Sequence, residues 1–368
     1  MYEYKLNQFL KVAKGSIKAS KLLEKTVEKL NEDALLEVKD ILMKHDTVIT
    51  IGIKNTGQIN KKYIKRLIDK GKYVWHTIDF MSEGGRAVDD RLINPLTLRP
   101  MTGSSSATAL NVLYGINDIG IGTDGGGSVL APALSLNLCS IMAKGMGLKG
   151  SIDRVSTDGI KFVPGIGVIS HSFELAKESI FTMLDVKEKV IRFENIKVCI
   201  CKKGEITLPD GKDMREKLDL VLSKLMDMKI TIGEEEFPDF ENRENSIERM
   251  NEIFKAYDMV ITCEGPIDIL GLGDSVFGTL GSFAKSVQNK SGKYMVKIAN
   301  MLNATSITLP INEVASGIVI TSKEGLEEGM AAISVVENLK DIYSLPDLYY
   351  RYFKESYLRE NKDIIFSL

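Results

Sequence analysis

Short apolar runs rich in β-branched residues alternate with amphipathic helical stretches along most of this 368-residue chain. The run TVITIGI has the length and composition of a buried strand, and YVWHT, IKVCIC, KITIGEEEF and YDMVITC also indicate strands. Between the first two, Tyr63, Ile64, Leu67 and Ile68 form a helical stripe. This alternation predicts an α/β fold, a single-domain α/β/α sandwich with a large mixed, mostly parallel sheet flanked by helices.

The first residues of the chain predict two amphipathic helices. Leu23, Val27 and Leu30 follow an i, i+4, i+7 stripe, and a second stripe runs through Leu35 and Leu42. We therefore expect helices over residues 1–46, ahead of the first buried strand.

Composition excludes several classes of protein. The 48 basic residues nearly balance the 50 acidic residues, so no bulk charge favours nucleic acid or an anionic membrane as a partner. The chain has neither the apolar run of a signal peptide nor a continuous apolar stretch of about 20 residues. Its four cysteines are too few and too scattered for a disulfide framework, and Cys199 and Cys201 are better explained as buried thiols than as a metal or redox site. These features predict a soluble cytoplasmic protein with no cofactor and no metal.

The segment Gly103–Ala131 concentrates the residues that suggest chemistry. A serine cluster, Ser104–Ser106, opens it, and GTDGGGS near its end places three glycines before Ser128. A serine hydroxyl needs a neighbouring base to become a nucleophile. None of the three histidines lies in a recognisable nucleophile motif, so each is better explained as structural, although a Ser–His–Asp triad stays open.

Lys54 is a stronger candidate for the base. It directly follows the apolar run TVITIGI, where its amine can be held in a dry site. Desolvation lowers the pKa of a lysine, and a general base at neutral pH requires such a lowered pKa. The alternative is a solvated lysine at the end of a strand.

The glycines before Ser128 allow a tight turn whose amide groups converge on one point. Gly120, Gly122 and Gly125 also match the dinucleotide pattern GxGxxG, but the strand–turn–helix register around them is poor. The serine cluster taken alone is also compatible with a helix N-cap.

In combination these segments resemble the amidase signature family, hydrolases with a Ser–cis-Ser–Lys triad. The resemblance rests on TGSSSATA, GTDGGGSVLAP and GMGLKGSIDRVS, and it continues through YDMVITCEGP and SGIVITSKEGLEEGMAA. It implies that Ser128 is the acylated nucleophile and Lys54 the base. Ser104 is then the relay between them, with a cis peptide bond from Gly103 to Ser104.

The same resemblance implies roles for further residues. The backbone amides of Gly125, Gly126, Gly127 and Ser128 are expected to form the oxyanion hole. Ser105 is expected to support the proton relay, and Asp124 to fix the glycine loop. Within one amidase-like domain, 1–368, residues 47–187 then form the catalytic core, 188–340 the remaining sheet and helices, and 341–368 a C-terminal aromatic segment.

Departures from the family pattern bear on the substrate. The family often has an arginine two residues after the nucleophile, and Leu130 stands there, which argues against a small acidic substrate. The chain is also shorter than typical members between KITIGEEEFP and YDMVITC, so we expect a pocket that is more open or is closed by a partner subunit. The aromatic segment is expected to pack against the protein itself, with a homodimer contact as the alternative.

Three functions remain open at this point. The first is hydrolysis of a small-molecule or peptide-like carboxylic amide through an acyl-enzyme. The second is transfer of the acyl group to an amine other than water, as in amidotransferases. The third is a catalytically silent subunit that binds without reacting.

Overall fold

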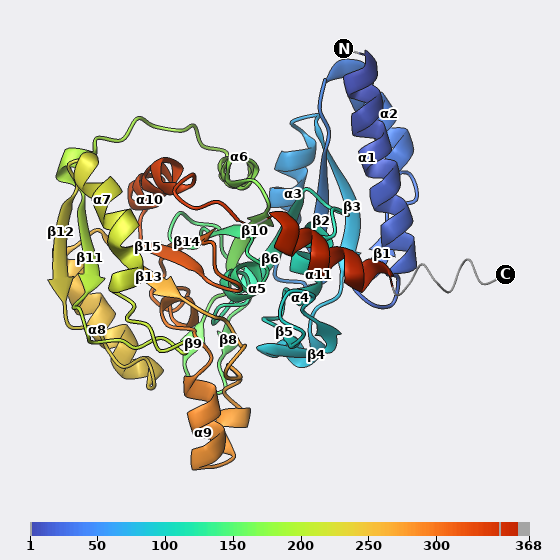
Figure 1. Ribbon diagram of the computed structural model, residues 1–368. Helices are drawn as coiled ribbons and strands as arrows, with labels where there is room; N and C mark the ends of the chain where they lie inside the picture. The colour runs from blue at the N-terminus through green and yellow to red at the C-terminus, as the bar shows by residue number, and fades with distance from the viewer. Residues whose placement is uncertain (1, 346, 360–368) are drawn as a thin grey trace.

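The computed structural model describes residues 2–345 and 347–359. The described helices lie on both sides of a central sheet (Figure 1). They are α1 (Tyr2–Lys21), α2 (Ala34–Lys44), α3 (Lys61–Ile68), α4 (Ser106–Leu113), α5 (Leu130–Ser135), α6 (Phe173–Leu184), α7 (Asp219–Asp227), α8 (Arg243–Ala256), α9 (Ser282–Asn289), α10 (Leu326–Leu339) and α11 (Asp347–Arg359).

One 11-stranded sheet joins segments from the whole length of the chain, in the order β1-β3-β2-β6-β10-β7-β14-β15-β13-β11-β12. Its strands are β1 (Val27–Leu30), β2 (Ile49–Lys54), β3 (Tyr73–Asp79), β6 (Ile119–Asp124), β7 (Cys139–Met142), β10 (Gly165–Ser170), β11 (Lys197–Cys201), β12 (Thr231–Glu235), β13 (Met259–Glu264), β14 (Thr305–Pro310) and β15 (Gly317–Ser322). Two small antiparallel pairs lie outside it, β4 (Val88–Ile93) with β5 (Pro100–Thr102), and β8 (Arg154–Val155) with β9 (Lys161–Phe162).

The α/β sandwich with a large mixed sheet is confirmed, but the expected excess of parallel pairs is wrong. Parallel pairing is confined to β2 with β3 and β6, and to β11 with β12 and β13. The other neighbours in the sheet run antiparallel. Short links explain part of the difference, since the chain between Pro310 and Gly317 has no room for the helix that a parallel crossover requires.

The N-terminal prediction is half right. The second expected helix is α2, whereas Val27–Leu30 is the edge strand β1, paired antiparallel with β3. The helix before it, α1, ends at Lys21, and Glu24 then takes a positive φ of 64°. A stripe of three apolar residues is too short to distinguish a helix from a strand that places one of them in the core. Here that residue is Val27, which is buried.

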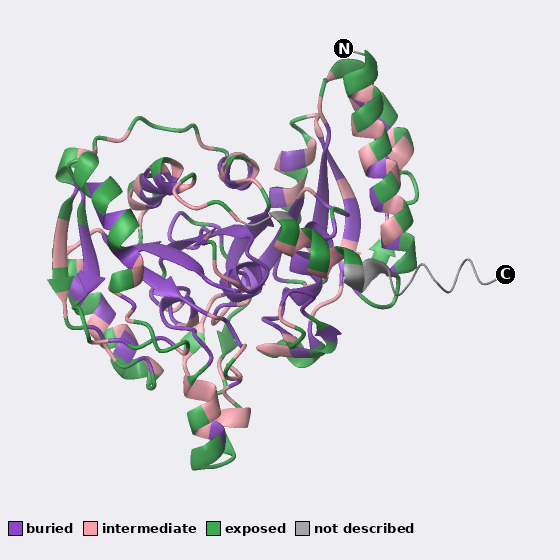
Figure 2. Ribbon diagram, in the orientation of Figure 1, coloured by how far each residue is buried: buried purple, intermediate pink, exposed green. Residues whose placement is uncertain are grey.

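Helices cover both faces of the sheet around β6. Ile119 and Ile121 point into a core that includes Leu67 of α3 and Ile180 of α6. The opposite face of β6 packs against α4, where a Cβ at Gly120 would come within 2.5 Å of Thr108 Cγ2. Gly120 therefore lies inside a strand and allows α4 to pack closely against it. A dinucleotide site would instead have this glycine in the turn between a strand and a helix. In Figure 2 the central strands are buried, and every residue of β6 and α4 is buried, whereas the edge strand β12 is not.

The C-terminal aromatic segment packs on the protein's own surface. The hydroxyl of Tyr349 donates to Leu96 O at 2.7 Å, and that of Tyr350 donates to Asn137 O at 2.9 Å. Their rings and Phe353 pack against the core around α4 and α5, while Tyr352 is exposed. Residues 360–368 of this segment lie outside the described residues. None of the described helices is long and apolar enough to cross a membrane.

Candidate active site

Two neighbouring parallel strands bring the predicted base and the glycine loop together at the carboxyl ends of the strands. β2 ends at Lys54 and the neighbouring β6 ends at Asp124, so the segments that follow both strands leave the sheet side by side. The serine cluster enters α4 beside them, and Ser128 lies two residues before α5. Lys54, Ser104 and Ser128 line the same pocket, which has a volume of about 420 Å³.

The amine of Lys54 is buried and held by oxygen atoms. Its Nζ lies 2.6 Å from Ser104 Oγ and 2.9 Å from Thr123 Oγ1. Desolvation by burial lowers the pKa of Lys54 from 10.5 to about 7; the negative charge of Asp124 opposes this and the positive charge of Arg154 adds to it. Near neutral pH a large fraction of this amine is therefore unprotonated, with a lone pair available to accept a proton.

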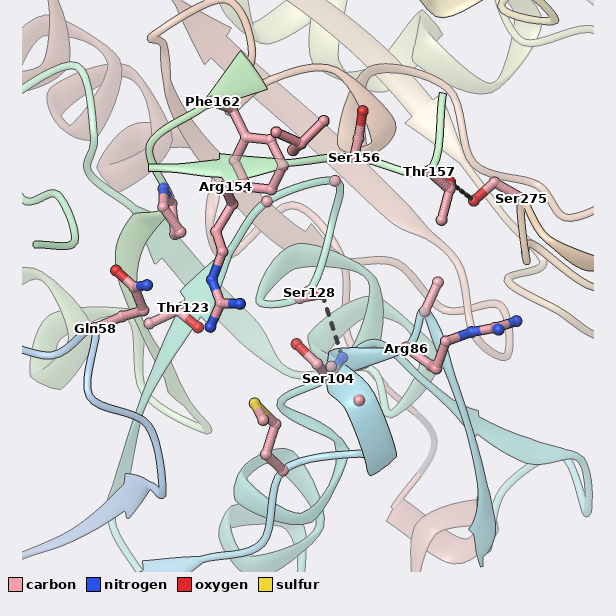
Figure 3. A pocket seen from close by; sticks show the side chains of 18 of the residues that line it. Gln58, Arg86, Ser104, Thr123, Ser128, Arg154, Ser156, Thr157, Phe162 and Ser275 are labelled. Atoms are coloured by element: carbon pink, nitrogen blue, oxygen red, sulfur yellow. Dashed lines mark hydrogen bonds between the residues drawn. The ribbon is translucent and has the colours of Figure 1, made fainter. Parts of the chain in front are cut away.

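Ser104 and Ser128 are adjacent, but their hydroxyl groups do not bond each other in this structure. Instead the backbone N–H of Ser104 donates to Ser128 Oγ at 3.2 Å (Figure 3). One bond of the expected relay, between Lys54 and Ser104, is thus formed, and the second requires the Ser128 hydroxyl to turn.

The predicted cis peptide bond between Gly103 and Ser104 is wrong. Among the described residues the one cis peptide bond is Gly265–Pro266. Gly103 instead has a positive φ of 74°, which turns the chain while the peptide bond keeps the trans form that non-prolyl bonds favour by about 3–4 kcal/mol. Its N–H donates to Ala87 O at 2.7 Å, which fixes this turn next to the pocket.

Asp124 organises the glycine loop through three backbone N–H groups. Its Oδ1 accepts from Gly127 at 2.7 Å, and its Oδ2 accepts from Val129 at 2.7 Å and Leu130 at 3.2 Å. Burial raises the pKa of Asp124, and these N–H groups oppose that rise by stabilising the carboxylate.

The backbone N–H of Gly127, one of the donors expected in the oxyanion hole, is therefore already hydrogen-bonded to Asp124. The Gly127 N–H points at Asp124, because a side chain three residues upstream reaches it as in an Asx-type turn. The N–H groups of Gly125, Gly126 and Ser128 have no acceptor among the described residues. These three amides are the donors that remain for an oxyanion.

Close packing explains two of the glycines. A Cβ at Gly125 would lie 2.5 Å from the Cε2 atom of Phe162, whose ring covers the loop. Gly127 has a φ of 102°, and a Cβ there would lie 3.0 Å from Val296 O. The loop is thus held between Phe162 on the pocket side and the chain at Val296 behind it.

Ser105 lies behind the site and makes no hydrogen bond to Ser104 or Ser128. Its Oγ donates to Thr123 O at 3.4 Å, and it is fully buried against β6. A Cβ at Gly122 would lie 2.6 Å from this oxygen. Its contacts place it as a spacer between α4 and β6.

Sequence reasoning missed Thr123, which holds the lysine. Its Oγ1 is the second hydrogen-bond partner of the Lys54 amine, and the residue is buried at the end of β6. Its place directly before Asp124 in GTDGGGS was the signal available. Asn300 was also missed; its Nδ2 donates to Gly125 O at 3.2 Å from a segment distant in sequence.

The pocket wall comes partly from segments for which the sequence predicted no role. Besides the residues above, it includes Gln58 after β2, the segment around Arg86, the hairpin β8–β9 and Ser275 (Figure 3). The pocket is neither a sealed cavity nor a flat surface. Within the described chain, no group of histidine, cysteine or acidic residues could hold a metal ion, and His45, His76 and His171 all lie outside the pocket lining.

No family model and no curated protein matches the sequence. Solved structures match the fold across most of the chain. An amidase superposes with a TM-score of 0.61 at 13% identity, covering 90% of this chain and 96% of its own. A fatty acid amide hydrolase gives 0.62 at 14% identity, covering 91% and 82%. One subunit of the glutamyl-tRNA(Gln) amidotransferase from Thermotoga maritima gives 0.59 at 14% identity, covering 86% and 88%. The chain has the fold of the amidase signature enzymes.

Proposed function

We propose that this protein hydrolyses a carboxylic amide through an acyl-enzyme on Ser128, with Lys54 as the base and Ser104 as the relay. The observation that carries the proposal is the buried Lys54 amine, 2.6 Å from Ser104 Oγ, with a pKa lowered to about 7. A lysine that only served as a surface charge would not be buried against two hydroxyl groups. The proteins of similar fold named as amidases and as an amide hydrolase agree with this chemistry.

In the acylation step the proton of Ser104 Oγ passes to neutral Lys54, and the proton of Ser128 Oγ passes to Ser104. For this the Ser128 hydroxyl turns from the Ser104 N–H toward Ser104 Oγ. The Ser128 oxygen then forms a bond to the amide carbon, and the carbonyl π electrons move onto the carbonyl oxygen. The N–H groups of Gly125, Gly126 and Ser128 are the donors placed to hold that oxyanion.

Collapse of the tetrahedral intermediate breaks the C–N bond. The proton on Lys54 returns through Ser104 to the departing nitrogen, so the amine leaves neutral. Water then attacks the acyl-enzyme by the same relay, and the products are a carboxylic acid and the amine. An amine that replaced water in this second step would make the protein an acyltransferase.

A fluorophosphonate probe followed by intact-mass analysis tests the proposal. We expect one adduct on the wild type, no adduct on Ser128→Ala, and labelling slowed by about 100-fold or more in Ser104→Ala and Lys54→Ala. Ser156→Ala is the matched control, because Ser156 lines the same pocket outside the proposed relay. It should label at the wild-type rate.

The same experiment identifies the alternatives. An unlabelled wild type, or an adduct that persists in Ser128→Ala, would contradict the proposal, and the first result would favour a silent binding protein. A labelled protein that releases product from simple aliphatic amides only when hydroxylamine is added would favour acyl transfer over hydrolysis.

A further inference from the structure

The hairpin β8–β9 is fixed to the loop that follows the lysine strand. The side-chain oxygen of Gln58 accepts the N–H of Ile152 at 3.1 Å, and Ser151 Oγ donates to Gly57 O at 3.2 Å. Gln58 is itself buried. These bonds set the position of Arg154, two residues further along, relative to the end of β2.

The far end of the hairpin is fixed to other walls of the pocket. Arg243 at the start of α8 donates to Asp158 at 3.0 Å, and the hydroxyl groups of Thr157 and Ser275 are hydrogen-bonded. Anchors at both ends hold Arg154 in place, although it lies on a two-residue strand. Directly across the hairpin it faces Phe162, the ring that covers Gly125.

Arg154 differs from the other arginines of the pocket in having no counter-ion. Arg86 is paired with Asp274 at 2.6 Å, and Arg243 is paired with Asp158. The guanidinium of Arg154 makes no hydrogen bond or ion pair with any residue that the structure describes, although its backbone pairs with Phe162 in the hairpin. Asp274 is the one carboxylate in the lining, and it is already occupied by Arg86.

The guanidinium of Arg154 points into the pocket. Figure 3 shows its side chain extending from the hairpin toward Thr123 and Ser104, whereas the guanidinium of Arg86 turns away on the other side. An unpaired guanidinium offers several N–H donors in a planar fork, a geometry that matches a carboxylate.

We propose that Arg154 binds an anionic group of the substrate, a carboxylate on the acyl side of the scissile amide, so that the protein acts on amides of dicarboxylic acids. This inference rests on the proposed function, because it takes Ser128 as the point of attack. The carboxylate occupies the donors of Arg154 while the amide carbonyl lies over the glycine loop.

This inference runs against the expectation drawn from Leu130. The side chain of Leu130 is fully buried in the core and does not line the pocket, so the residue at that position cannot meet a substrate here. The cation that such a substrate needs comes from the hairpin instead.

The charge of Arg154 also connects recognition to the base. It is one of the groups that lower the pKa of Lys54. A bound carboxylate offsets that charge, so a substrate with the anionic group favours proton uptake by Lys54 more than a neutral amide does.

Matched pairs of amides test the inference. We would compare ω-carbamoyl alkanoates, from succinamate to adipamate, with the corresponding neutral diamides, and measure kcat/KM from ammonia release. At least one acid should be preferred over its diamide by about tenfold to 100-fold, the range of a charge-assisted hydrogen-bonded pair. Arg154→Gln should abolish that preference, and Arg154→Lys should retain part of it.

Lys161→Gln is the matched control. It removes one positive charge from the same hairpin, on the strand opposite Arg154, but Lys161 does not line the pocket. The preference for the acid should survive in this variant. Equal kcat/KM for every pair in the wild type, or an acid preference that survives Arg154→Gln, would overturn the inference.

Protection of Ser128 separates this inference from the proposed function. In a protein that the fluorophosphonate labels, succinate, glutarate or adipate should slow labelling of the wild type and not of Arg154→Gln, while the diamides have no such effect. Labelling without selective protection by any of these diacids overturns the inference and leaves the proposed function intact. If Ser128 does not label, the proposed function fails. Calorimetry then decides: diacid binding that Arg154→Gln removes supports the anion site, and no binding overturns it.

Discussion

The Nζ atom of Lys54 lies 2.6 Å from Ser104 Oγ, and the residue is only 2% exposed. A buried ammonium group is costly, and the structure provides no carboxylate in hydrogen-bond contact to offset that cost. Burial therefore shifts the protonation equilibrium of Lys54 toward the neutral amine, and a neutral amine beside a hydroxyl group is a base ready to accept its proton. The position of Lys54 at the end of β2 is thus the feature from which the proposed chemistry follows.

Thr123 positions this amine, and its loss should change both the rate and the pH profile. Thr123→Val removes the oxygen that accepts from Lys54 at 2.9 Å and keeps the shape of the side chain. We expect the plateau rate of Ser128 labelling to fall by about tenfold or more, since small misplacement of a catalytic group is costly.

The midpoint of that profile should move below the wild-type value near pH 7, because the lost acceptor stabilised the ammonium form. Thr123→Ser, which keeps the hydroxyl, should restore both quantities. An unchanged midpoint in Thr123→Val would reduce Thr123 to a packing residue.

The ring of Phe162 leaves no room for a side chain at Gly125, and a double variant tests this steric conflict. Gly125→Ala places a methyl group 2.5 Å from Phe162 Cε2, so the loop or the ring must move. We expect Ser128 labelling to slow by about tenfold or more, because the oxyanion donors shift. The double variant Gly125→Ala/Phe162→Ala should recover most of the rate of Phe162→Ala alone.

Gly57→Ala is the control for this pair. Gly57 also lies close to the pocket wall, has no atom within 4 Å of an added Cβ, and does not take a positive φ. It should label normally. A double variant as slow as Gly125→Ala alone would show that the clash with Phe162 is not the cause.

Much of the fold follows from the sequence because the central strands are buried on both faces. Runs such as Thr47–Ile53 have no regular polar face, and few other elements accommodate such a run, so β2, β3, β11 and β13 were predicted close to their observed bounds. The edge strand β12 was also predicted, although none of its residues is buried. Whether neighbouring strands run parallel or antiparallel could not be predicted from the local sequence of each strand. It depends on which strands become neighbours, and the hairpin from β14 to β15 is antiparallel because its connection is short.

The candidate site also has features that the sequence predicted and features that it did not. The resemblance of the Lys54, serine-cluster and glycine-loop segments to the amidase signature pattern selected residues that the structure brings into one pocket. The placement of the Arg154 side chain in the pocket depends on contacts between segments far apart in sequence. The direction of the Gly127 N–H and the trans bond after Gly103 depend on local backbone angles. No pattern in a single sequence reports those features.

The buried carboxyl group of Asp79 should make stability depend on pH. Burial raises the pKa of Asp79 from 3.8 to about 7, although Thr77 and Asn111 donate hydrogen bonds to its Oδ1. A group with a raised pKa in the folded state stabilises the fold below its unfolded value, and this contribution is lost as the pH rises through the folded value. Between about pH 4 and 7 the wild type should lose about 1.4 kcal/mol per pH unit relative to Asp79→Asn, with no further change above pH 7.

Urea unfolding of both proteins across this pH range measures the difference. The exposed Asp227 is the control, and Asp227→Asn should track the wild type at every pH. Parallel pH curves for wild type and Asp79→Asn would show that Asp79 stays ionised in the folded protein.

The pH dependence of Ser128 labelling tests the central claim most directly. The fluorophosphonate rate constant, followed from about pH 5.5 to 9, should rise as Lys54 loses its proton, with a midpoint near 7, and then level off. In Lys54→Ala the rate should be low and should lack this inflection. A wild-type rate that is flat across the range, or that equals the Lys54→Ala rate at high pH, would contradict a lysine-based activation of Ser128.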